Sequence, residues 1–173
     1  AHGHNNVYGV NANGNSEIKL NGDLTMAKDG DKWAIENVIN GDVTTALGEA
    51  SWKNIAGINA SGAGASVTVD GKTTIAANGS GVVAADGGTV NLGAADIEID
   101  NSDEKWYHYH VLGAALGTVN VGDEGKTVTV KGNAGIFGMQ GQDKTFASDS
   151  KESVINLKLT TADSSWTGIA YKY

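Results

Sequence analysis

The chain has 173 residues and a net charge of −8, and it contains no Cys, no Pro and no Arg. Nucleic-acid binding is excluded, because its affinity comes mostly from clustered Lys and Arg. The absence of Cys excludes disulfides, thiolate metal sites and thiol catalysis. This length corresponds to one domain or to one segment of a longer array.

Glycine accounts for 25 residues, about twice the usual share. A chain without Pro makes its turns with Gly, Asn and Asp and keeps every backbone N–H available for strand pairing. No stretch approaches the roughly 18 apolar residues that a membrane-spanning helix needs, so we expect no transmembrane segment in this chain.

Apolar and polar residues alternate along most of the chain, which predicts short β-strands. Residues 1–16 are expected to form an irregular lead-in. The alternating pieces that follow are Ile18–Leu20, Leu24–Met26, Val67–Val69, Val90–Leu92, Ile97–Ile99, Val119–Val121, Val128–Val130 and Leu157–Leu159. Helical periodicity is scarce, so the sequence predicts an all-β fold.

An internal repeat predicts the architecture. Val67–Val69 and Val90–Leu92 lie 23 residues apart, and two further β-like pieces, Thr74–Ala76 and Val82–Ala84, lie between them. Three short strands in a period of roughly 20 to 25 residues are typical of a parallel β-helix. At this period the whole chain would form about seven or eight coils of one solenoid.

A second pair of similar segments supports the repeat. Val43–Ala46 and Leu159–Ala162 are similar and are each followed by a Ser-Trp pair.

A β-sandwich or barrel is the alternative fold, because it would also show regular short strands. Its antiparallel hairpins would use Asn-Gly and Asp-Gly turns, which occur here at Asn21-Gly22, Asp29-Gly30, Asn40-Gly41 and Asp70-Gly71.

Residues 100–110 and 140–153 interrupt the repeat and are predicted to be projecting loops, where solenoids usually bind their ligands. The first loop contains an aromatic run that we take as the candidate ligand-binding site: Trp106, Tyr107, His108, Tyr109 and His110. Exposed aromatic rings stack on sugar faces and dominate binding hot spots. The alternative is that these rings fold down and cover the side or end of the solenoid.

Other candidate sites are weaker. His108 and His110 would point the same way on a strand, but a zinc site needs three or four protein ligands, so no metal or other cofactor is predicted. Asp96, Glu98 and Asp100 alternate with apolar residues and are expected to form a solvated acidic face. Their spacing does not forbid glycoside hydrolysis. Because no nucleophile, base and orienting group assemble in the sequence, no catalytic residue is predicted.

Two sequence patterns stand out in the chain: a strand followed by a Ser-Trp-x-Gly turn, at Ile155–Leu159 with Asp163–Gly168, and the segment Gly87–Gly93 with its echo at Gly117–Gly122. With a background that extends from about Glu17 to Tyr173, they resemble the passenger domains of bacterial autotransporters, of the pertactin-like and self-associating adhesin group. This resemblance implies a right-handed parallel β-helix that is exported through the outer membrane and displayed on a Gram-negative surface. Members of that group act mostly as adhesins or in self-aggregation.

The expected function is therefore that of a non-catalytic adhesin or structural segment. Residues 1–173 would form one β-helical segment of a longer passenger, secreted or displayed on the cell surface. Its partner would be a host surface glycan, a matrix protein or another copy of the chain. The alternatives are a β-helical polysaccharide-degrading enzyme, a β-sandwich lectin and a passive stalk that spaces a distal binding region from the membrane.

Overall fold

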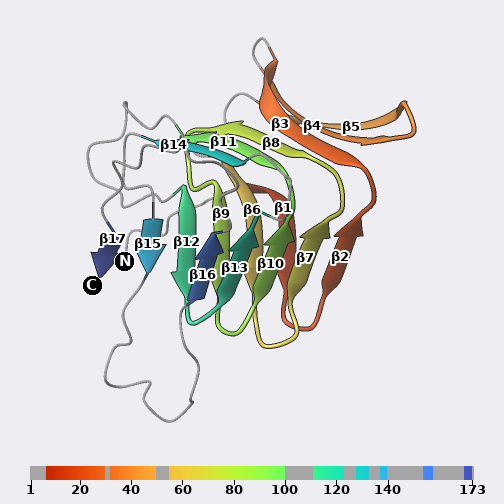
Figure 1. The fold of residues 1–173 in the computed structure, drawn as a ribbon. Helices are drawn as coiled ribbons and strands as arrows, with labels where there is room; N and C mark the ends of the chain where they lie inside the picture. The colour runs from red at the N-terminus through yellow and green to blue at the C-terminus, as the bar shows by residue number, and fades with distance from the viewer. Residues whose placement is uncertain are drawn as a thin grey trace.

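The computed structural model describes residues 7–29, 32–49, 55–99, 111–122, 128–132, 137–139, 154–157 and 170–172. These residues form an all-β structure of stacked, mostly parallel sheets (Figure 1), which confirms that the fold is all-β. No helix in this part of the chain is long and apolar enough to cross a membrane.

The strands belong to three sheets, which we call the first, second and third sheet. The first contains β1 (Val7–Asn13), β6 (Ile55–Ser61), β9 (Val82–Ala85), β12 (Leu112–Ala115), β15 (Phe137–Met139) and β17 (Ala170–Lys172). The second contains β2 (Glu17–Leu20), β7 (Ser66–Val69), β10 (Thr89–Leu92), β13 (Thr118–Val121) and β16 (Val154–Leu157). The third contains β3 (Asp23–Asp29), β4 (Lys32–Ile39), β5 (Asp42–Glu49), β8 (Thr73–Ala77), β11 (Ala95–Ile99) and β14 (Val128–Gly132).

From β6 to β14 the chain visits the first, second and third sheets in turn, and we call each visit to all three sheets a passage. Each strand pairs in parallel with the strand of the same sheet in the preceding passage. The predicted 23-residue repeat is confirmed as strand register, because Val67 pairs with Val90. The next partner, Val119, follows 29 residues after Val90, and Ile155 follows another 36 residues later. The two longer passages are those that contain residues 100–110 and 140–153.

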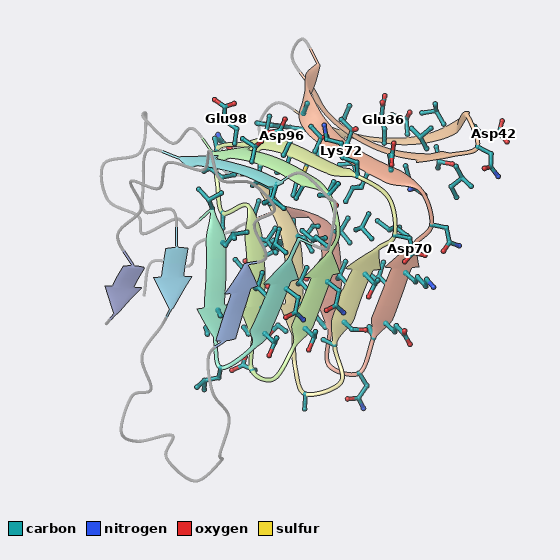
Figure 2. All side chains as sticks on the ribbon, viewed as in Figure 1. Glu36, Asp42, Asp70, Lys72, Asp96 and Glu98 are labelled. Atoms are coloured by element: carbon teal, nitrogen blue, oxygen red, sulfur yellow. The ribbon has the colours of Figure 1, made fainter. Side chains whose placement is uncertain are left out.

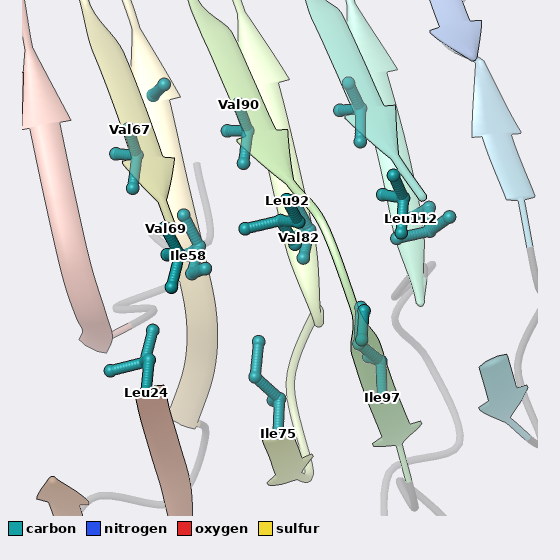
Figure 3. Close-up of a cluster of buried hydrophobic side chains, with 14 of the residues drawn as sticks. Leu24, Ile58, Val67, Val69, Ile75, Val82, Val90, Leu92, Ile97 and Leu112 are labelled. Carbon is teal, nitrogen blue, oxygen red and sulfur yellow. The ribbon is translucent and has the colours of Figure 1, made fainter. Parts of the chain in front are cut away.

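The core lies between the sheets and is built from the inward residue of each alternating pair. Val67, Val90 and Val119 stack in register on the second sheet and are completely buried. Ile75 and Ile97 do the same on the third sheet (Figure 3). Stacking of like side chains removes apolar surface from water at every passage, and each Å² buried contributes roughly 25 cal/mol of stabilising free energy. The alternation of apolar and polar residues therefore matches the buried and exposed faces of these strands.

The turn between the first and second sheets contains a strained residue. Leu116 has a φ of 59°, in the left-handed region, and the equivalent residue one passage earlier is Asp86, with a φ of 53°. This conformation costs an ordinary L-residue about 1–2 kcal/mol, whereas Asn and Asp tolerate it.

We therefore expect Leu116→Asn to raise the free energy of unfolding by about 1 kcal/mol, measured by denaturant titration. The reciprocal variant Asp86→Leu serves as the control and should lower it by a similar amount or more, since Asp86 also accepts a 3.3 Å hydrogen bond from Ser61. If Leu116→Asn leaves the free energy of unfolding unchanged, backbone strain at this turn does not limit stability.

The third sheet departs from the repeat at one end. After β3 the chain forms the antiparallel strands β4 and β5, which extend that sheet beyond the ends of the other two (Figure 1). Asn40 and Gly41 connect β4 to β5 with φ values of 52° and 91°, as a tight hairpin turn requires. Among the described residues, the antiparallel pairing that the alternative fold predicts thus occurs between β3 and β4 and between β4 and β5, inside a mostly parallel structure.

The hairpin corrects two expectations. Val43–Ala46, expected to belong to a coil repeat, lies in the antiparallel strand β5. The first sheet has six strands, so the described chain makes fewer passages than the seven or eight coils predicted. The physical reason is that residues 32–49 pair with β3 and with each other, and therefore do not form a further passage through the three sheets.

The expected lead-in also needs correction. Val7–Asn13, expected to be irregular, forms β1 and pairs in parallel with β6. The sequence does not show this strand clearly, because small and polar residues occupy most of its positions. Of its described side chains, only that of Ala12 is completely buried. The predicted loops at 100–110 and 140–153 lie outside the described residues.

Candidate functional site

The outer face of the second sheet carries polar side chains in two rows. Because side chains alternate along each strand, the residues between the buried Val and Leu positions all point outward. The parallel register then aligns them across strands. One row contains Glu17, Ser66, Thr89 and Thr118, and the other contains Lys19, Thr68, Asn91 and Asn120. We call these two rows the polar face.

Hydrogen bonds between side chains run along the second row of the polar face. The Asn120 Nδ2 amide donates to Asn91 Oδ1 at 2.7 Å, and Asn91 Nδ2 donates to Thr68 Oγ1 at 3.3 Å. An amide has two N–H donors and an oxygen with two lone pairs, so these bonds use one donor and one lone pair of Asn91. The row is therefore held in one arrangement and still carries hydrogen-bonding groups that face outward.

One ion pair lies at the end of the polar face. Lys19 Nζ is 3.4 Å from Asp70 Oδ2, and the two side chains are 58% and 47% exposed. Solvent screens such a pair, and its contribution to stability is about 0–1 kcal/mol. Glu17 in the neighbouring row adds a second negative charge, so the three charged side chains at this end of the polar face sum to −1 beside neutral Ser, Thr and Asn side chains.

The outer face of the third sheet is different, because its charged residues are mostly acidic. Asp96 and Glu98 point outward from β11, as the sequence predicts, and Glu36 lies on the same face of β4 (Figure 2). Asp42 lies at the end of the hairpin in the same view. Within the described residues, no group of three His, Cys, Asp or Glu side chains is placed to hold a metal ion.

The aromatic run of the sequence prediction is not among the residues that the structure describes. Trp106, Tyr107, His108, Tyr109 and His110 all lie in the segment between β11 and β12. Asp100, the third of the alternating acids, lies there too. The structure therefore brings together Asp96 and Glu98 on one face, and the ligand-binding prediction for the aromatic run remains a prediction.

The polar face could be recognised in part from the sequence. The echo between Gly87–Gly93 and Gly117–Gly122 contains the same Thr-Val-Asn unit, and the structure pairs Thr89 with Thr118 and Asn91 with Asn120. The first passage was not identifiable from that echo, because Glu17 and Lys19 occupy the corresponding positions. A search for outward residues at the same place in each alternating strand would have found all eight.

The arrangement of sheets defines a class of all-β protein with stacked parallel strands and a polar outer face. No family model, no curated protein and no solved structure matches this chain.

Proposed function

We propose that the chain is a segment of a right-handed parallel β-helix, and that it works as a non-catalytic adhesive or structural module. The repeated passage through three sheets with parallel pairing supports the β-helix. A connection between parallel strands of one sheet is right-handed in almost all proteins, which supports that hand. With the resemblance to autotransporter passengers, this favours display on the surface of a Gram-negative bacterium.

The observation that carries the adhesive role is the polar face. Its two rows present hydroxyl, amide and charged groups at the spacing of paired strands, about 4.8 Å, over four neighbouring strands. The hydrogen bonds from Asn120 to Asn91 and from Asn91 to Thr68 pre-organise one row, so little side-chain entropy remains to be lost on binding. Many weak contacts along such a face add up to avidity.

The proposed partners are a host surface glycan, a matrix protein or another copy of the chain. A glycan presents a series of hydroxyl groups that exchange hydrogen bonds with Thr and Asn side chains, and the aromatic run at 106–110 would add stacking on sugar rings. Nucleic acid does not fit a face whose charged residues are one Glu, one Lys and the neighbouring Asp70.

The test is retention of the purified chain on immobilised glycans, matrix proteins and copies of itself. We expect Thr68→Ala/Asn91→Ala/Asn120→Ala to reduce retention at least tenfold, since it removes the ordered row. The double variant Trp106→Ala/Tyr109→Ala tests the aromatic run separately. Thr25→Ala/Thr74→Ala, on the outer face of the third sheet, is the matched control and should bind as the parent chain does.

Each other outcome points to a different function. Retention that only the aromatic variant abolishes would place binding in the 100–110 segment and not on the polar face. No retention on any surface would contradict the adhesive role and leave the passive stalk. Release of reducing ends or unsaturated sugars from polysaccharides would instead support the β-helical enzyme.

A further inference from the structure

The hairpin ends the third sheet with an exposed edge. β5 is the last strand in that sheet, and no described strand pairs with its far side. Val43 on β5 is 56% exposed, and Ile39 at the end of β4 is 42% exposed; these are the large apolar side chains that are exposed in the described part of the chain. Thr44 and Thr45 are exposed as well. The edge therefore offers backbone hydrogen-bonding groups together with apolar surface.

The sequence of β5 lacks the features that usually protect an edge strand. Proteins block such edges with Lys, Pro, bulges or very short strands. β5 is eight residues long, and its sequence, Asp-Val-Thr-Thr-Ala-Leu-Gly-Glu, contains neither Lys nor Pro. Its two charges lie at its ends, and the middle is uncharged and partly β-branched, which is the composition of a strand that pairs readily.

The turn geometry determines which residues of β5 face the free edge. In a hairpin closed by a two-residue turn such as Asn40-Gly41, the flanking pair Ile39 and Asp42 is hydrogen-bonded. Hydrogen-bonded pairs then alternate along β4 and β5. The backbone N–H and C=O groups of Val43, Thr45 and Leu47 consequently point away from β4, toward the free edge.

We propose that a second copy of the chain pairs with this edge, β5 against β5 in antiparallel orientation, with the two-fold axis at Thr45. Thr45 would lie opposite Thr45 of the second copy, and Val43 opposite Leu47. All these positions direct their backbone groups to the edge, so each pair can exchange two hydrogen bonds. The third sheets of the two copies would join into one continuous sheet.

Charge and face favour this register over its neighbours. Asp42 would lie opposite Gly48 of the second copy, and Glu49 would lie opposite Gly41, so no acidic residue would face another. A shift by one position would place Asp42 opposite Glu49 and would also put outward residues on the inner face. A shift by two in the same sense would place Val43 opposite Glu49. Among the registers that keep outward residues on one face, the register centred on Thr45 is the one that pairs apolar residues twice, as Val43 with Leu47.

This inference does not depend on the proposed function, because β5 lies in the third sheet and the polar face lies on the second. The isologous contact uses the same strand from both copies and closes after two copies. It therefore predicts dimers and not fibres.

The first test uses the absence of Cys in the parent chain. In the proposed dimer the Cα atoms of the two Thr45 residues are about 5.5 Å apart, within the range that a disulfide spans. Thr45→Cys should give a covalent dimer under mild oxidation that dithiothreitol reverses. Thr74→Cys, on the same outward row but inside the sheet, is the matched control and should remain monomeric. Failure of Thr45→Cys to cross-link would overturn the proposal.

The second test exchanges charge at the axis, with analytical ultracentrifugation as the measurement. Thr45→Lys and Thr45→Glu should each raise the dimer dissociation constant about tenfold or more, because two like charges then face each other. Mixing the two variants should restore dimers, which also shows that both are folded. Parent chain that stays monomeric at high concentration would overturn the proposal, as would dimers of Thr45→Lys as tight as those of the parent. Dimers lost in Thr68→Ala/Asn91→Ala/Asn120→Ala but kept in Thr45→Lys would assign association to the polar face.

Discussion

Ile97→Ala is expected to lower the free energy of unfolding by about 2–5 kcal/mol. Ile97 is completely buried in β11, and it is paired in register with Ile75 on one side and with position 130 on the other. Truncation removes apolar contacts and leaves a cavity between neighbouring passages. The stacked strands cannot close that cavity, because their spacing is set by backbone hydrogen bonds on both sides.

The measurement is urea unfolding followed by far-UV circular dichroism, with Glu98→Ala as the matched control. Glu98 is the next residue on the same strand but points to solvent, so its replacement should change stability by no more than about 0.5 kcal/mol. Equal effects of the two substitutions would contradict the assignment of inward and outward faces on β11.

Gly81→Val is expected to be the second most damaging change, at about 1–3 kcal/mol or more. A Cβ at Gly81 would collide with the backbone carbonyl of Val111 in the next passage and with the Ile97 side chain. The Val111 carbonyl accepts the Val82 N–H at 2.9 Å, so it cannot move away without breaking the pairing of neighbouring strands. Any accommodation must therefore separate the passages.

Gly93→Ala is the control for this experiment, because a Cβ there would meet no atom within 4 Å. Thermal unfolding of both variants is the measurement, and we expect a clear loss of Tm for Gly81→Val and a small change for Gly93→Ala. Gly81→Val unfolding at the Tm of the parent chain would show that the contact between Gly81 and Val111 is looser than the structure has it.

Local sequence patterns predicted a large part of the fold. Val67, Val90 and Val119 reveal both the inward face and the spacing of the second sheet, since strand alternation has a period of two and each passage repeats the unit. The Thr-Val-Asn echo lies on two strands that pair in register, where Asn120 donates to Asn91. These features depend on residues near each other in sequence or on exact repetition.

The hairpin could not be predicted in the same way. Asn40-Gly41 is a good hairpin turn, but an Asn-Gly or Asp-Gly pair also serves the turn between two sheets, as at Asn21-Gly22 and Asp70-Gly71. The difference lies in what the following strand pairs with. Val43–Ala46 pairs with β4, and that choice is made by competition among distant strands and not by its own sequence.

By itself, the sequence determined the strand type, the inward and outward faces and the 23-residue register, because alternation and repetition are properties of the local chain. The tertiary structure decided that β4 and β5 extend the third sheet, that β5 forms its edge, and that Thr68, Asn91 and Asn120 meet in one hydrogen-bonded row. The physical reason is that backbone hydrogen bonds between strands connect residues that are far apart in sequence, and any strand of suitable alternation can compete for them.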